Sequence, residues 1–188
     1  MYNGMKEKGK RKKESIEKGE IDMGTIKVYS LEYGGDGMCC LVAREGSGYA
    51  KGYPIKDNKT TANVLDVTFA PTVKVNRYVY MVACDREGKG LGLFVVACGE
   101  GSKLMDNIRN ILLSAMLCRA ETIFFARNDP KGKETFTEEE LEDFFQVKEI
   151  VKQVGILAKD YLLLLEYGYL SAEEEMKQER TGKNHNQT

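Results

Sequence analysis

The sequence predicts one α/β (α+β) domain, in which helices flank a mixed β-sheet that begins with an N-terminal β-hairpin. A chain of 188 residues falls in the range of a single domain and can bury a core. Several short runs are apolar at every residue, which is typical of strands covered on both faces. Between these runs, apolar side chains recur with helical spacing, as in helices that pack one face against a sheet.

The hairpin is predicted by two stretches that surround a glycine-rich turn. Residues 26–31 alternate between apolar and polar side chains, and residues 38–43 form a second apolar run. The intervening residues 34–37 read Gly-Gly-Asp-Gly, and such residues tolerate the positive φ angles of tight turns. We therefore expect two antiparallel strands here.

The next segments predict a short helix and two central strands. Residues 60–70 favour a helix only weakly, because several of them are β-branched, and Pro71 ends it. Residues 78–84 and 92–98 are continuous apolar runs joined by the turn-rich segment 85–90. Runs of this kind belong in the middle of a covered sheet.

A second helix and a third buried strand follow. Apolar spacing predicts a helix that begins near Ser102 or Asp106 and ends near Arg119. Residues 122–126 form the next apolar strand, which continues into a polar loop at 127–132. Loops at the carboxyl ends of central strands are where α/β folds place their chemistry.

The last third of the domain predicts a capped helix and two further strands. Thr137 and Glu140 fit a capping box, in which each side chain accepts a hydrogen bond from the other residue's backbone N–H. The helix then ends at Gly155. Two apolar strands are predicted at 156–158 and 161–165.

The two ends of the chain differ from this core. Residues 1–23 are rich in charged side chains and glycine, and they predict a mobile tail. Residues 172–188 are polar and predict a second tail that begins as a short helix. The domain itself is therefore expected to span residues 24–171.

Composition excludes several classes of function. With 28 basic and 29 acidic side chains the net charge is -1, so no overall field attracts nucleic acid or lipid, and no apolar run is long enough to span a bilayer. The single histidine, His185, lies in the C-terminal tail, which excludes Ser-His-Asp and Cys-His nucleophiles and histidine-bound zinc from the domain. Five cysteines without a C-x-x-C pair, and no apolar leader, predict reduced thiols in a cytoplasmic protein.

Two clusters are candidates for ligand binding, and each has a structural alternative. Residues 99–103 are glycine-rich and lie between a strand and a helix, where backbone N–H groups can meet an anion, or else they form a turn that Ser102 caps. Asp129 and Glu140 can offer oxygen ligands to magnesium or calcium. Alternatively, the carboxylates of residues 138–140 favour the positive end of the helix dipole and face water.

The motifs around these carboxylates resemble those of the RadC-type JAB/MPN (JAMM) domain, which has a cytidine-deaminase-like fold. Residues 126–132 read A-R-N-D-P-K-G where that family has A-H-N-H-P-S-G, and residues 137–140 stand where its S-x-x-D opens a helix. Residues 155–156 and 160–161 are similar to the family's L-G-I and D-H motifs. The likeness covers residues 56–171.

This resemblance implies that the metal chemistry of the family has been lost. In catalytic JAMM domains two histidines and an aspartate hold zinc, a glutamate acts as the base, and a serine stabilises the oxyanion. Here Arg127 and Asp129 stand at the two histidine positions, and Glu140 stands at the aspartate position. Arg77 stands where the family has the glutamate, and Lys131 where it has the serine. Cationic side chains repel zinc, and a tetrahedral site needs about three protein ligands. No cofactor is therefore expected.

The replaced positions place Arg77, Arg127 and Lys131 around Asp129. Such a cluster is either a closed salt bridge or a pocket for a phosphate or a carboxylate terminus. The resemblance implies a pseudo-enzyme, a non-catalytic binding or scaffold module linked to DNA repair or mobile-element biology. Its partner would be a protein or a nucleic-acid end, with no role for a membrane, and a homodimer is also expected because MPN-type domains often pair. The alternative is a residual zinc-dependent, peptidase-like hydrolase that uses Asp129 and Glu140.

Overall fold

The computed structural model describes residues 25–35, 38–44, 50–51 and 54–185, so the predicted tail at 1–23 lies outside the described residues. The strands are β1 (Thr25–Ile26), β2 (Val28–Tyr33), β3 (Cys39–Ala43), β4 (Ala50–Lys51), β5 (Tyr78–Cys84), β6 (Gly90–Cys98), β7 (Thr122–Asn128), β8 (Leu157–Leu165) and β9 (Gly168–Ser171). The α-helices are α1 (Asn58–Phe69), α2 (Ile108–Leu117), α3 (Glu138–Gln153) and α4 (Ala172–His185), with short 3-10 helices η1 (Pro71–Val73) and η2 (Met105–Asn107).

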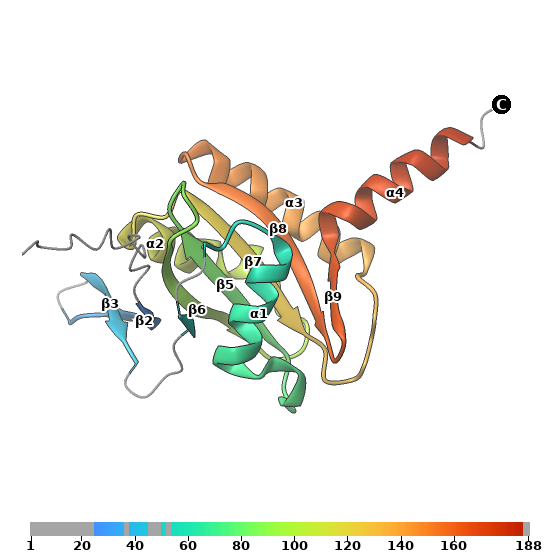
Figure 1. Cartoon of the computed structure of the whole chain (residues 1–188). Coiled ribbons are helices and arrows are strands. Elements are labelled where there is room, and N and C mark those ends of the chain that lie inside the picture. The colour runs from blue at the N-terminus through green and yellow to red at the C-terminus, as the bar shows by residue number, and fades with distance from the viewer. Residues whose placement is uncertain (1–24, 36–37, 45–49, 52–53, 186–188) are drawn as a thin grey trace, which may run out of the picture.

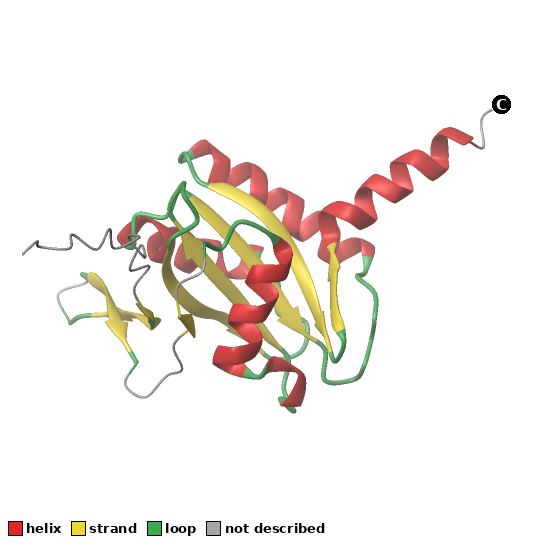
Figure 2. Cartoon of the chain, viewed as in Figure 1, coloured by secondary structure: helices red, strands yellow, loops and turns green. Residues whose placement is uncertain are grey.

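A mixed seven-stranded sheet in the order β3-β2-β6-β5-β7-β8-β9 forms the centre of the domain, which confirms the predicted α/β fold (Figure 2). The pairs β2–β6 and β7–β8 are parallel, and the other neighbours are antiparallel. The predicted hairpin is confirmed by the β2–β3 register, in which Tyr33 faces Cys39 beside the turn. β1 and β4 form a separate two-stranded sheet.

Both faces of the central strands are covered, as their apolar sequences predict. On one face, Met81 and Phe125 pack with Phe144 of α3 and Ile111 of α2. On the other face, Val82 and its neighbours pack with α1 (Figure 1). The odd and even residues of β5 and β7 thus enter two separate cores, which is the arrangement that a period of two imposes.

The weakly predicted first helix is confirmed as α1. Its N-terminus carries a capping box in which the Asp57 carboxylate accepts from the Thr60 backbone N–H at 2.7 Å. Leu65 on its inner face is fully buried. Capping and burial together outweigh the weak helix propensity of the β-branched residues.

The second helix differs from its prediction at the N-terminus. The predicted Ser102 cap is wrong, because the Ser102 hydroxyl donates to the Gly99 carbonyl instead of accepting from the helix. The carboxylate of Asp143 in α3 accepts from the backbone N–H groups of Leu104 and Met105, at 2.6 and 3.0 Å. A side chain distant in sequence therefore satisfies the amides that open η2.

The two strands predicted at 156–158 and 161–165 are one strand, β8, and this prediction was wrong. Asp160 lies at an irregularity in the β7–β8 register, and its carboxylate accepts from the backbone N–H groups of Tyr161 and Glu173. These bonds keep a buried charged residue inside the strand. The edge strand β9, which pairs with the end of β8, was not predicted.

The segment after Ser171 begins with the helix α4, whose first residue, Ala172, is fully buried. The Ser171 hydroxyl donates to the Asp160 carboxylate, and the Ser171 Oγ also accepts from the Glu174 backbone N–H. Beyond this start α4 extends away from the sheet (Figure 1). Among the described helices, none is long and apolar enough to cross a membrane.

Candidate functional site

The candidate site lies where β7 ends and α3 begins. The predicted loop at 127–132 starts later than expected, because Arg127 and Asn128 are the last two residues of β7 and pair with Leu163 and Leu164 of β8. Only the segment after Asn128 leaves the sheet. The strand therefore holds Arg127 in a fixed direction, and the loop brings Asp129 beside it.

Arg127 is the centre of the cluster, with only 1% of its side chain exposed. Its Nη1 lies 3.3 Å from Oδ2 of Asp129, and its Nη2 lies 2.9 Å from Oε2 of Glu140. Nη2 also donates to the Thr135 carbonyl, and the guanidinium carbon lies 5.3 Å from the centre of the Phe136 ring. The guanidinium thus lies between the two carboxylates and contacts both.

Glu140 connects Arg127 to Arg77, the residue just before β5. Oε1 of Glu140 accepts from Arg77, and Oε2 accepts from Arg127 and from the Thr137 backbone N–H. Burial raises the pKa of Glu140, but the Thr137 N–H and the two guanidinium charges outweigh it, so its pKa lies below the ordinary value. Glu140 is therefore an ionised carboxylate with both oxygens in use, and not the water-facing residue that the alternative interpretation expected.

Tyr161 of β8 completes the cluster, although the sequence analysis did not single it out. Burial raises the pKa of this phenol to about 12, against the opposing effect of Arg127 and Arg77. Tyr161 is consequently a neutral phenol beside the guanidinium groups. Its place directly after Asp160, at a position that resembles the D-H motif of the family, is the signal that could have revealed it.

The side chain of Asn128 holds the end of β7 against the segment that precedes β5. Its side-chain amide donates to the carbonyls of Pro71 and Asn76, and its oxygen accepts from the Tyr78 backbone N–H. These bonds tie the end of β7 to the segment that carries Arg77. The position of Arg77 opposite Glu140 is thus set by the backbone and not by the ion pair alone.

Lys131 does not join the cluster. Its ammonium group pairs with Glu100 at 2.6 Å, and both side chains are about 70% exposed. The Lys131 backbone N–H, in contrast, donates to Oδ1 of Asp129. The expectation that the Lys131 side chain would join Arg77 and Arg127 in the cluster is therefore wrong: its ion pair is with Glu100, and its charge acts on Asp129 only more weakly.

The glycine-rich segment 99–103 lies beside the cluster, and its charges are also matched. Lys103 pairs with Glu139, and the amides that open η2 bind Asp143. Together with Arg77 and Tyr161 these residues line a cavity of about 200 Å³. An anion entering here would meet three carboxylates, those of Glu139, Glu140 and Asp143.

Zinc does not fit the residues present. In the described part of the chain, no three His, Cys, Asp or Glu side chains are grouped so that they can hold a metal ion. Asp129 and Glu140 are separated by the Arg127 guanidinium, which a metal would have to displace. The side-chain chemistry of this cluster is that of a closed ion-pair network.

Comparison with known families identifies the domain that carries this cluster. A model of the RadC-like JAB domain matches residues 55–178, which include the cluster, α1 and the sheet from β5 to β9. A comparison with curated protein sequences found no match. By its motifs, its sheet order and this match, the chain belongs to the RadC-like JAB domain family.

Proposed function

We propose that this RadC-like JAB domain is non-catalytic and acts as a binding or scaffold module for a protein partner or a nucleic-acid end. One observation carries the proposal: the guanidinium of Arg127 is buried between Asp129 and Glu140, the two carboxylates that would otherwise be available to a metal. Removing any member of such a buried cluster leaves a charge without its partner, so these carboxylates are committed to the arginine and are not free to hold a metal.

The rest of the cluster supports the same proposal. Glu140 uses both oxygens for Arg77, Arg127 and the helix cap, so it cannot also activate a water molecule. Tyr161 is a neutral phenol at physiological pH. Asp129 likewise accepts from Arg127 with one oxygen and from the Lys131 backbone N–H with the other, and these engaged carboxylates argue against the alternative of a residual hydrolase.

Elemental analysis of protein purified without a chelator tests this proposal. We expect well under about 0.1 equivalent of zinc, because the site lacks the roughly three ligands that zinc needs. A restored variant that combines Arg77→Glu, Arg127→His, Asp129→His, Lys131→Ser and Glu140→Asp is the positive control and should bind zinc. Near-stoichiometric metal in the unmodified chain, lost in an Asp129→Ala, Glu140→Ala variant, would overturn the proposal.

A further inference from the structure

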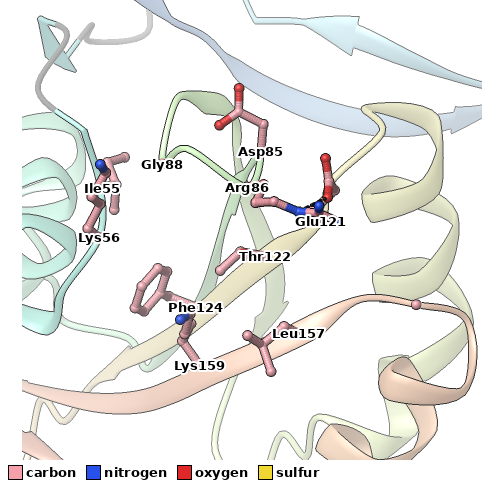
Figure 3. Close-up of a pocket in the computed structure, with 11 residues that line it drawn as sticks. Ile55, Lys56, Asp85, Arg86, Gly88, Glu121, Thr122, Phe124, Leu157 and Lys159 are labelled. Carbon is pink, nitrogen blue, oxygen red and sulfur yellow. Dashed lines mark ion pairs between the residues drawn. The ribbon is translucent and has the colours of Figure 1, made fainter.

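A second cavity, of about 440 Å³, lies at the opposite end of β7 from the ion-pair cluster. Thr122 opens β7 and Arg127 is five residues later, so the two sites are about 16 Å apart along the strand. The cavity is on the face of the sheet that α1 covers only in part. Its walls come from residues 55–56, the β5–β6 turn, and the first residues of β7 and β8 (Figure 3).

The wall formed by the β5–β6 turn is held rigidly against the segment before α1. The Ile55 backbone N–H donates to the Gly88 carbonyl at 2.7 Å. Gly88 has a φ of +87°, and a Cβ at this position would lie 2.8 Å from Cγ of Lys56. This close approach requires glycine and fixes the start of the Lys56 side chain.

The acidic groups of the cavity, Asp85 and Glu121, both have hydrogen-bonding or ionic contacts, although Asp85 forms no ion pair with a described residue. One oxygen of Asp85 accepts from the backbone N–H groups of Glu87 and Lys89 and so shapes the turn. Glu121 forms an ion pair with Arg86 at 3.0 Å, drawn as a dashed line in Figure 3. These contacts leave the charges of Arg86 and Glu121 matched.

Two lysines of the cavity are not matched in this way. Lys56 and Lys159 both line it, and neither forms an ion pair with any residue that the structure describes. In the view of Figure 3, the ring of Phe124 lies between the Ile55–Lys56 segment and Lys159. Phe124 is only 2% exposed, so the accessible apolar surface of this wall is that of Leu157, which is 45% exposed.

We propose that this cavity binds a small phosphate monoester that carries an apolar group. Two unmatched ammonium groups suit a phosphate, which bears a charge of about −1.5 to −2 at neutral pH, better than a singly charged carboxylate. Lysine contacts phosphate as a point charge, without the fixed geometry that arginine requires. The apolar group would lie against the exposed Leu157, and Thr122 offers a hydroxyl donor. The size of the cavity is typical of small-molecule sites.

A titration of the full ¹⁵N-labelled chain with phenyl phosphate, followed by NMR, tests this inference independently of the proposed function. At up to about 10 mM ligand, a site with a Kd near 1 mM would approach saturation. We expect shifts at residues that line the cavity, and weaker binding of inorganic phosphate, which lacks the ring, and of benzoate, which lacks the second charge.

Lysine variants identify the groups that bind. Lys56→Ala and Lys159→Ala should each weaken phenyl phosphate binding by about tenfold. Lys89→Ala is the matched control, because it removes a charge that lies on the β5–β6 turn but outside the cavity. Its effect on binding should stay within about twofold because that charge is screened by solvent. The inference is overturned by absence of shifts at the cavity, by unchanged binding in both variants, or by an equal loss in Lys89→Ala. Inorganic phosphate or benzoate binding as tightly as phenyl phosphate would overturn the proposed ligand class.

Discussion

At the carboxyl end of β7, Arg127 and Arg77 are largely buried and each contacts a carboxylate. At its amino end, two lysines border an open cavity and form no ion pair with a described residue. Arg127 is 1% exposed and lies between Asp129 and Glu140. Lys56 and Lys159, in contrast, are exposed to solvent in the cavity wall. A buried charge must be paired, because its desolvation cost is otherwise several kcal/mol, while an exposed lysine remains hydrated and needs no partner.

This comparison separates structure from binding within one sheet. The carboxyl end occupies the place where the family resemblance predicts chemistry, yet its charges are satisfied internally. At the amino end, in contrast, Lys56 and Lys159 belong to none of the motifs discussed and form no ion pair with a described residue. The pairing of charges, and not their number, therefore distinguishes a structural cluster from a candidate site.

The largest expected effect is on stability at the carboxyl end. Arg127→Met leaves Asp129 without its cation and Glu140 with Arg77 alone, and we expect the free energy of unfolding to fall by about 3 to 5 kcal/mol. Urea denaturation measures this change. Arg86→Met is the matched control at the amino end: its ion pair with Glu121 is exposed, so the loss should stay below about 1 kcal/mol. Equal losses in the two variants would remove the contrast between the two ends.

A smaller effect is expected from Glu140→Gln, which keeps the shape of the side chain but removes its charge. The loss should be about 1 to 3 kcal/mol at neutral pH, since Arg77 keeps only a neutral acceptor here and Arg127 keeps only one of its two carboxylates. The pKa of Glu140 is lowered in the folded protein, so its charge contributes stability above the ordinary value of 4.5, and this contribution is lost as the pH falls through the folded value. The variant should lack this part of the acid dependence. Urea midpoints across that range check the prediction, and identical slopes for both proteins would contradict it.

Much of this fold could be predicted because its signals are local. The hairpin, the apolar central strands and the capping box at Thr137 each depend on residues close together in sequence. The continuity of β8 could not be predicted in this way, since a charged Asp160 looks like a break in an apolar strand. Ser171 and Glu173, which are distant from it in sequence, supply the hydrogen bonds that allow it there.

The candidate site was predictable only in part, because it too depends on contacts between residues that are distant in sequence. Family motifs identified Arg77, Arg127, Asp129 and Glu140, but a charge near Asp129 in sequence need not be near it in space. Lys131 lies within a turn closed by the Gly132 N–H and the Asp129 carbonyl, and its side chain reaches Glu100 instead. The cavity at the other end of β7 is formed by four separate segments, so no local pattern could indicate it.

The wall of that cavity can be tested by adding a single methyl group. Gly88→Ala introduces a strained φ and a contact of 2.8 Å with Lys56, and we expect a loss of about 1 to 3 kcal/mol. Gly155→Ala, also in the cavity wall, has a similar φ of +81° but nothing within 4 Å of the added atom, so it should cost only about 1 kcal/mol. The difference between the two free energies of unfolding isolates the contact. No difference would mean that the turn is not held firmly against Lys56.

The smallest expected effect on stability completes the contrast. Lys56→Ala combined with Lys159→Ala removes two charges, yet the free energy of unfolding should change by no more than about 0.5 kcal/mol, because neither ammonium group is buried or paired. Thermal and urea unfolding of the double variant measure this. A loss comparable to that of Arg127→Met would show that these lysines hold the fold together. A neutral result means that they can be changed without cost to folding, which is the property expected of side chains that serve a ligand.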